Sequence, residues 1–155
     1  MLKIQWFMTK QIEDIQSLSY YGTITPLSVA RGEFAATTVG NYALFGGGWT
    51  GSARSNVVDA YDTSLTRTTA TPLSQARNNL VATTVGNYAL FGGGYTGSAS
   101  NVVDAYDTSL TRTTATALSV ARYSLAATTV GNYALFGGGY TGSARSDVVD
   151  VYYVF

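Results

Sequence analysis

The sequence predicts an all-β fold built from three copies of one antiparallel unit. A segment with the sequence TTVGNYALFGGG occupies residues 37–48 and recurs unchanged at residues 83–94 and 128–139. Each copy places short runs of β-branched and aromatic residues between glycine-rich turns, which is typical of strands that follow one another in antiparallel order. No helical period runs through a unit, so repeats made of helices are excluded.

Three repeats account for most of the 155 residues. Repeat 1 covers residues 27–72, repeat 2 covers 73–117, and repeat 3 covers 118–155 and stops about seven residues short of a full unit. Repeat 2 lacks the residue that matches Arg54, whereas repeat 3 restores it as Arg145. Because the repeats are so alike, we expect one structure used three times, and the few differences stand out.

Four strands are expected in each unit. In repeat 1 the first two are residues 34–39 (FAATTV) and 42–45 (YALF), joined by a tight turn at Gly40-Asn41, where both residues tolerate a positive φ. After a run of three glycines come residues 57–61 (VVDAY) and the Thr-rich, alternating residues 65–71 (LTRTTAT). Four short strands in about 45 residues fit one blade of a β-propeller.

The beginning of the chain lies outside these repeats. Residues 1–18 form an N-terminal arm with apolar residues on one helical face, so a short helix is expected at residues 9–17, and we interpret the arm as a segment that docks on an apolar surface. Residues 19–26 (SYYGTITP) match the end of a unit when Pro26 is aligned with Pro72, which makes residues 20–25 a fourth strand.

These ends predict how the blades assemble. The chain begins with a fourth strand and ends after a third one, at residues 148–152. Three blades are fewer than the 4–8 of a closed propeller, and an open half-ring leaves blade faces and strand edges bare. We therefore expect a homodimer of six blades, in which residues 20–25 of each chain complete the last blade of the other. The alternative is one piece of a larger propeller completed by other chains.

The unit resembles the kelch repeat. Two glycines follow the aromatic end of the second strand, the third strand ends in Tyr-Asp, and an Arg precedes the first strand. These elements are residues 45–47 with Tyr61-Asp62, residues 91–93 with Tyr106-Asp107, residues 136–138 with no Tyr-Asp in repeat 3, and the arginines Arg31, Arg77 and Arg122. The Trp of the kelch fourth strand is missing. The resemblance covers residues 27–155 and implies a propeller, but kelch propellers serve many functions, so it implies no single one.

Composition limits the chemistry that this chain can perform. Nine Lys/Arg balance nine Asp/Glu, so the basic excess that nucleic acids and anionic membranes require is missing. The chain has no Cys and no His, which excludes thiol nucleophiles and His-based catalysis, and its only lysines, Lys3 and Lys10, precede the repeats. We expect no enzyme activity, no cofactor and no metal. The first residues show no signal peptide, no stretch is long enough to span a bilayer, and the compartment is left open.

The differences between the repeats fall at two places in the unit: the two residues after the recurrent Arg, and the loop after the glycines. Antiparallel order places both at the same end of a blade, so they are expected on one face of the propeller, as in a ligand surface on a fixed frame. The candidate contact residues after the Arg are Gly32, Glu33, Asn78, Asn79, Tyr123 and Ser124, and those in the loop are Trp49, Tyr95, Tyr140, Arg54 and Arg145.

We interpret this face as the contact surface of a non-catalytic binding module for a protein or glycan ligand. The alternatives are a lectin-like propeller that stacks sugar rings on Trp49, Tyr95 and Tyr140, a subunit of an enzyme whose other chain is catalytic, and a scaffold with no selected ligand. The recurrent Arg31, Arg77 and Arg122 have two interpretations: they contact the ligand, or they bind carbonyls and an Asp inside the blade.

Overall fold

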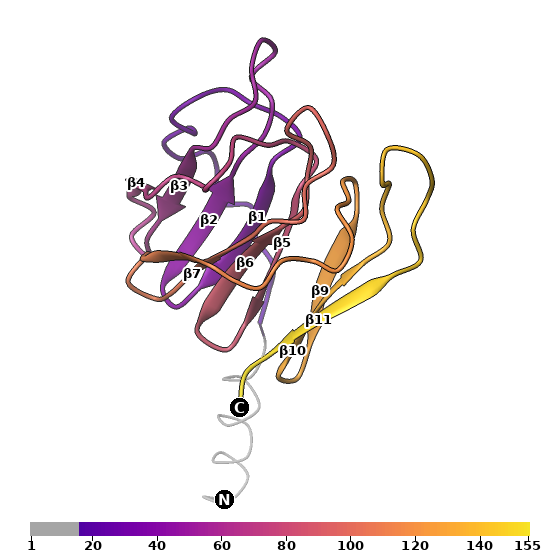
Figure 1. Ribbon diagram of the computed structural model, residues 1–155. Helices are drawn as coiled ribbons and strands as arrows, with labels where there is room; N and C mark the ends of the chain where they lie inside the picture. Colours follow the sequence, from indigo (N-terminus) through magenta and orange to yellow (C-terminus); the bar gives the residue numbers. More distant parts are fainter. Residues whose placement is uncertain (1–15) are drawn as a thin grey trace, which may run out of the picture.

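The computed structural model describes residues 16–155, which form three antiparallel sheets (Figure 1). The first sheet consists of β1 (Ala35–Val39), β2 (Tyr42–Gly46), β3 (Val58–Tyr61) and β4 (Arg67–Ala70). The second consists of β5 (Val81–Val85), β6 (Tyr88–Gly92), β7 (Val103–Tyr106) and β8 (Arg112–Thr114). The third consists of β9 (Ala126–Val130), β10 (Tyr133–Gly137) and β11 (Val149–Tyr153). Within these residues there is no helix, and the all-β prediction is confirmed.

Each sheet is a meander in which consecutive strands pair, as in a propeller blade. The β1–β2 register joins Val39 to Tyr42 across the Gly40-Asn41 turn, which confirms the expected hairpin. The fourth strand is shorter than the expected residues 65–71 because Leu65 has a φ of 61° and belongs to the preceding turn. Asp62 closes that turn, since its Oδ1 accepts hydrogen bonds from the backbone amides of Ser64 and Thr66.

Three of our expectations about the ends need correction or cannot be placed. The third sheet has three strands among residues 16–155 rather than four, and residues 20–25 form no strand and are exposed. A strand needs the edge of a sheet beside it, and no strand among residues 16–155 pairs with residues 20–25. The N-terminal arm of residues 1–18, with its expected helix at 9–17, falls almost entirely outside the described residues.

The sheets pack face against face, and the first strands β1, β5 and β9 follow one another across the molecule (Figure 1). The core lies in the two junctions between the sheets. In each junction a phenylalanine ring covers a glycine of the preceding blade: Phe91 lies over Gly46, and Phe136 lies over Gly92. A Cβ added at either glycine would come within 2.8 Å or 2.6 Å of that ring, so the blades can approach this closely only with glycine at both positions.

The burial of equivalent residues depends on their place in the row of blades. One unit used three times predicts that the leucine of each YALF strand is buried. Leu44 and Leu90 are buried in the two junctions, but Leu135 is only half-buried. The reason is that the outer face of the third sheet, which carries Leu135, has no blade packed on it within the described part of the chain. Identical sequence therefore gives identical strands but different exposure.

A candidate ligand-binding pocket on the loop face

The two variable parts of each repeat pair directly with each other. Gly32 and Trp49 exchange two backbone hydrogen bonds of 2.9 Å and 2.8 Å, and Asn78 with Tyr95 and Tyr123 with Tyr140 do the same in the next two blades. The expectation that these positions share one face is thus confirmed. Gly48 permits this close approach, because a Cβ at that position would come within 2.5 Å of the carbonyl oxygen of Gly32.

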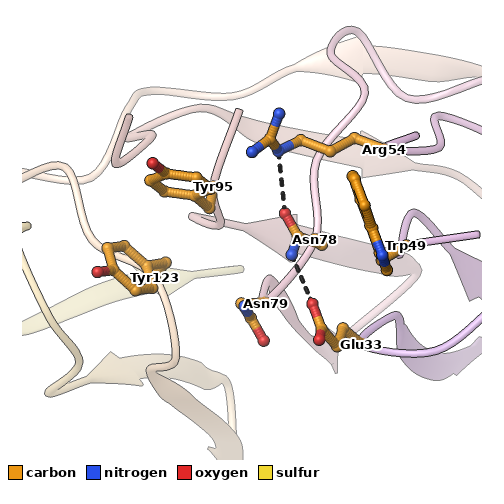
Figure 2. Close-up of a pocket in the computed structure, with 7 residues that line it drawn as sticks. All are labelled: Glu33, Trp49, Arg54, Asn78, Asn79, Tyr95 and Tyr123. Atoms are coloured by element: carbon orange, nitrogen blue, oxygen red, sulfur yellow. Dashed lines mark hydrogen bonds between the residues drawn. The ribbon is translucent and has the colours of Figure 1, made fainter. Parts of the chain in front are cut away.

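A pocket of about 350 Å³ lies on this face between the first and second blades (Figure 2). All of its lining residues belong to the candidate set predicted from the sequence. They are Glu33, Trp49, Arg54, Asn78, Asn79, Tyr95 and Tyr123. The residues that differ among the repeats therefore lie together around one pocket, although they belong to three different repeats.

The side-chain amide of Asn78 links two charged side chains of the pocket, Arg54 and Glu33. The Nε of Arg54 donates a 3.2 Å hydrogen bond to Oδ1 of Asn78, and Nδ2 of Asn78 donates to Oε2 of Glu33 (Figure 2). Asn78, at the centre of this bridge, is 8% exposed, whereas Arg54 is half-buried and Glu33 is exposed. The remaining guanidinium donors of Arg54 and the second carboxylate oxygen of Glu33 have no hydrogen bond in the described part of the molecule, and both side chains line the pocket.

A row of aromatic side chains runs along the same face. The guanidinium of Arg54 lies between two rings, 5.7 Å from the Trp49 centroid and 4.8 Å from that of Tyr95. The row continues with edge contacts from Tyr95 to Tyr123 at 5.1 Å and from Tyr123 to Tyr140 at 5.4 Å. Desolvation, followed by the neighbouring phenols of Tyr140 and Tyr95, raises the pKa of Tyr123.

On this face, the junction between the second and third blades differs from the junction between the first and second blades because of two sequence changes. Repeat 2 lacks the residue that matches Arg54, and Tyr123 occupies the position of Asn78. The edge contacts of Tyr123 with Tyr95 and Tyr140 take the place of the Arg–Asn–Glu arrangement. Beyond them, a cavity of about 410 Å³ at the free side of the third blade is lined by Tyr123, Ser124, Gly139, Tyr140 and Arg145.

The side chains of the recurrent arginines are buried inside the blades. Arg77 is fully buried, and its guanidinium donates to the carbonyl oxygens of Phe91, Gly93 and Val102 and, at 2.8 Å, to Oδ2 of Asp104. Arg31 pairs with Asp59 and Arg122 with Asp150 in the same way. Of the two interpretations left open by the sequence, the structure supports the bond to blade carbonyls and an Asp, because these guanidinium groups lie inside the blade, away from the pocket.

The carboxylates of the third strands have structural partners. Asp59, Asp104 and Asp150 bind the buried arginines, and Asp62 and Asp107 accept backbone amides in turns. In the part of the chain that the structure describes, no group of three or more His, Cys, Asp or Glu side chains could hold a metal ion. No helix among the same residues has the length and apolar character needed to cross a membrane.

One set of residues at the edge of the third sheet was not singled out by the sequence analysis. A cavity of about 600 Å³ lies beside β11 and is lined by Thr116, Ala117, Ser119, Asp150, Val151, Tyr152 and Tyr153. The equivalent edges of β3 and β7 are occupied by β4 and β8. The alignment of residues 20–25 with a fourth strand was the sequence signal that pointed to this edge.

Neither a scan against models of protein families nor a search of curated proteins found a match to this chain. The case for a function therefore rests on the pocket itself.

Proposed function

We propose that this protein is a non-catalytic binding module of kelch-type propeller blades, and that its ligand is held in the pocket between the first and second blades. The observation that carries the proposal is that residues that differ among nearly identical repeats gather around one pocket. The buried frame, with its Arg–Asp pair in every blade, is the same in all three. Binding proteins commonly combine a constant structural frame with variable contact residues in the loops, and the blades have this combination.

The chemistry of the pocket favours a ligand with both flat apolar faces and hydroxyl or amide groups. Trp49 and Tyr95 offer apolar surface, while Arg54, Asn79 and Glu33 offer hydrogen-bond donors and acceptors of both charges. Because the opposite charges of Arg54 and Glu33 share the pocket, a strongly charged ligand of either sign gains little. Neutral oligosaccharides and uncharged peptide segments both fit this description.

Of these two, carbohydrate is favoured by the aromatic row, since several aromatic rings along one face can contact successive linked sugar rings. The row extends through Trp49, Tyr95, Tyr123 and Tyr140 over all three blades. A protein ligand would use the same aromatics together with Arg54 as anchors. An array of neutral glycans and a displayed peptide library, probed with the full chain, separate the two classes.

The decisive variant is Trp49→Ala, paired with Tyr88→Ala as its control. Trp49 lines the pocket, whereas Tyr88 is an aromatic residue with 45% exposure at the start of β6 and belongs to neither the pocket nor the row. For the best glycan or peptide found, we expect Trp49→Ala to weaken binding by about tenfold or more and Tyr88→Ala to leave it unchanged. Equal effects of the two variants, or no binding on either array, would refute the proposal and leave a scaffold without a ligand.

A further inference from the structure

The two junctions inside the chain repeat one set of contacts, and this set defines what a third junction must contain. The Phe91 ring fills the hollow over Gly46, and Phe136 fills the hollow over Gly92. The amide of Gly48 donates to the carbonyl oxygen of Arg77 at 2.9 Å, and Gly94 donates to Arg122 at 2.8 Å. Each junction thus joins a hollow on one blade to a ring on the next.

The third blade carries the hollow without a ring. Among residues 16–155, a Cβ at Gly137 would meet only a methyl group of Val149 of its own sheet, at 3.5 Å, so none of these residues fills the space above Gly137. Apolar residues elsewhere on the same sheet are exposed: Val130, at the other end of the β9–β10 hairpin, is 65% exposed, whereas its equivalents Val39 and Val85 are 1% and 3% exposed. Val149 and Val151 of β11 are exposed by about half as well.

The first blade carries the corresponding phenylalanine ring, but within residues 16–155 no glycine hollow of another blade packs against it. Phe45 is the equivalent of Phe91 and Phe136, which are fully buried, but Phe45 is only half-buried. The same holds for its neighbours on this face. Leu27, Phe34 and Ala43 are half-buried, whereas their equivalents in the second blade, Leu73, Leu80 and Ala89, are buried.

The segment before the first blade is placed to act as a fourth strand. The hydroxyl of Tyr61 donates to the carbonyl oxygen of Thr25 at 2.8 Å, just as Tyr106 donates to Thr71 at 2.7 Å. Thr71 directly follows β4, the fourth strand of the blade before that of Tyr106. Thr25 therefore ends a segment that belongs to a blade preceding the first one, and the vacant edge of β11 is an edge of that kind.

We propose that a second copy of this chain docks its first blade on the third blade, and that this contact builds a further ligand pocket from both copies. Phe45 of the partner subunit fills the hollow over Gly137, and residues 20–25 of the partner pair with β11. Because the contact is reciprocal, two copies close a ring of six blades. Net charge is zero, so no overall repulsion opposes this association.

The composite pocket follows from the alignment of the repeats. Tyr140 and Arg145 correspond to Trp49 and Arg54, while the partner's Trp49 takes the position of Tyr95. The partner's Glu33 takes the position of Asn79, so a carboxylate comes near the guanidinium of Arg145. The cavity lined by Tyr140 and Arg145 is the half of this pocket that one chain provides. This part of the inference deepens the proposed function, whereas the docking of the second copy is independent of any ligand.

Molecular mass in solution tests the docking. We expect light scattering to give twice the chain mass of 16.4 kDa for the full chain. Gly137→Ala adds a methyl group where the partner's Phe45 must lie, and nothing among residues 16–155 of the same chain obstructs it. This variant should therefore give a folded single chain with unchanged circular dichroism. Ser143→Ala, in an exposed loop, is the matched control and should keep the double mass.

Two further variants keep the test decisive if Gly137→Ala folds poorly. Val151→Asp places a charge that is exposed in one chain but buried by a second copy, so it should also give single chains. Ile24→Pro removes the backbone N–H at the position that matches Ala115, which donates to Val103 in the second blade, and should weaken the docking as well.

A wild-type mass of one chain, or of three or more, would overturn the two-copy ring. A double mass that none of the three variants reduces would show that the copies meet elsewhere, which also overturns it. Loss of glycan or peptide binding changes none of these masses, so the assembly and the proposed function fail separately.

Discussion

Replacing Arg77 by Met should cost more stability than any exposed change in the chain. The side chains of Arg77 and Asp104 are both 0% exposed, with 2.8 Å between Nη2 and Oδ2. Removing the guanidinium leaves the carboxylate of Asp104 buried and takes the donor away from three carbonyl oxygens. Breaking a buried pair on one side costs about 3–5 kcal/mol, because the remaining charge has lost its compensation.

The structure places the expected cost toward the lower end of that range. Asp104 keeps two other partners: the amide of Ser74 at 3.1 Å and the guanidinium of Arg112 at 3.5 Å. Burial lowers the pKa of Arg77 in spite of the opposing attraction of Asp104, which shows that desolvation is the larger effect on this side chain. We therefore expect a loss of about 3 kcal/mol, and Asp104→Asn in the same chain should recover part of it.

Urea denaturation followed by circular dichroism measures this loss, and thermal melting should show a fall of about 6–12 °C for a chain of this size. Arg112→Met is the matched control, since Arg112 approaches the same carboxylate but is 27% exposed, and it should cost about 1 kcal/mol or less. If Arg77→Met cost no more than Arg112→Met, the buried pair would not be what holds the blade together.

Three further predictions follow from the burial of particular side chains. Leu90→Ala should cost about 2–5 kcal/mol, and Leu135→Ala clearly less when measured on single chains, because only Leu90 lies in a filled junction; equal losses would contradict the blade assignment. Burial, followed by the charge of Asp150, raises the pKa of Tyr152 to about 12. The stability that its neutral phenol provides is therefore present below pH 10 and lost as the pH rises from about 10 to 12. Alkaline denaturation of Tyr152→Phe should lack this component. Replacing Trp49, Tyr95 and Tyr140 together by Ala should abolish ligand binding and leave far-UV circular dichroism intact, and collapse of the fold would instead assign these rings to the core.

Much of the fold follows from local patterns in the sequence. The β-branched runs, the Gly40-Asn41 turn and the repetition of the unit determine the strands and their order, because hairpins form between neighbours in the chain. The same connectivity determines that the pairs after the recurrent Arg and the loops after the glycines lie at one end. For this reason every residue that lines the pocket of Glu33 and Trp49 could be predicted.

The tertiary structure decided what depends on neighbouring blades. Sequence alone could not separate a buried Arg77 from a ligand-binding one, because its exposure is determined by carbonyl groups and an Asp brought to it from 14 to 27 residues away. Leu90 and Leu135 have the same local sequence, yet within residues 16–155 a blade packs on the outer face of Leu90 and none packs on that of Leu135. Residues 20–25 have the sequence of a strand but are not one in a single chain, because a strand forms only where a second edge offers its hydrogen bonds.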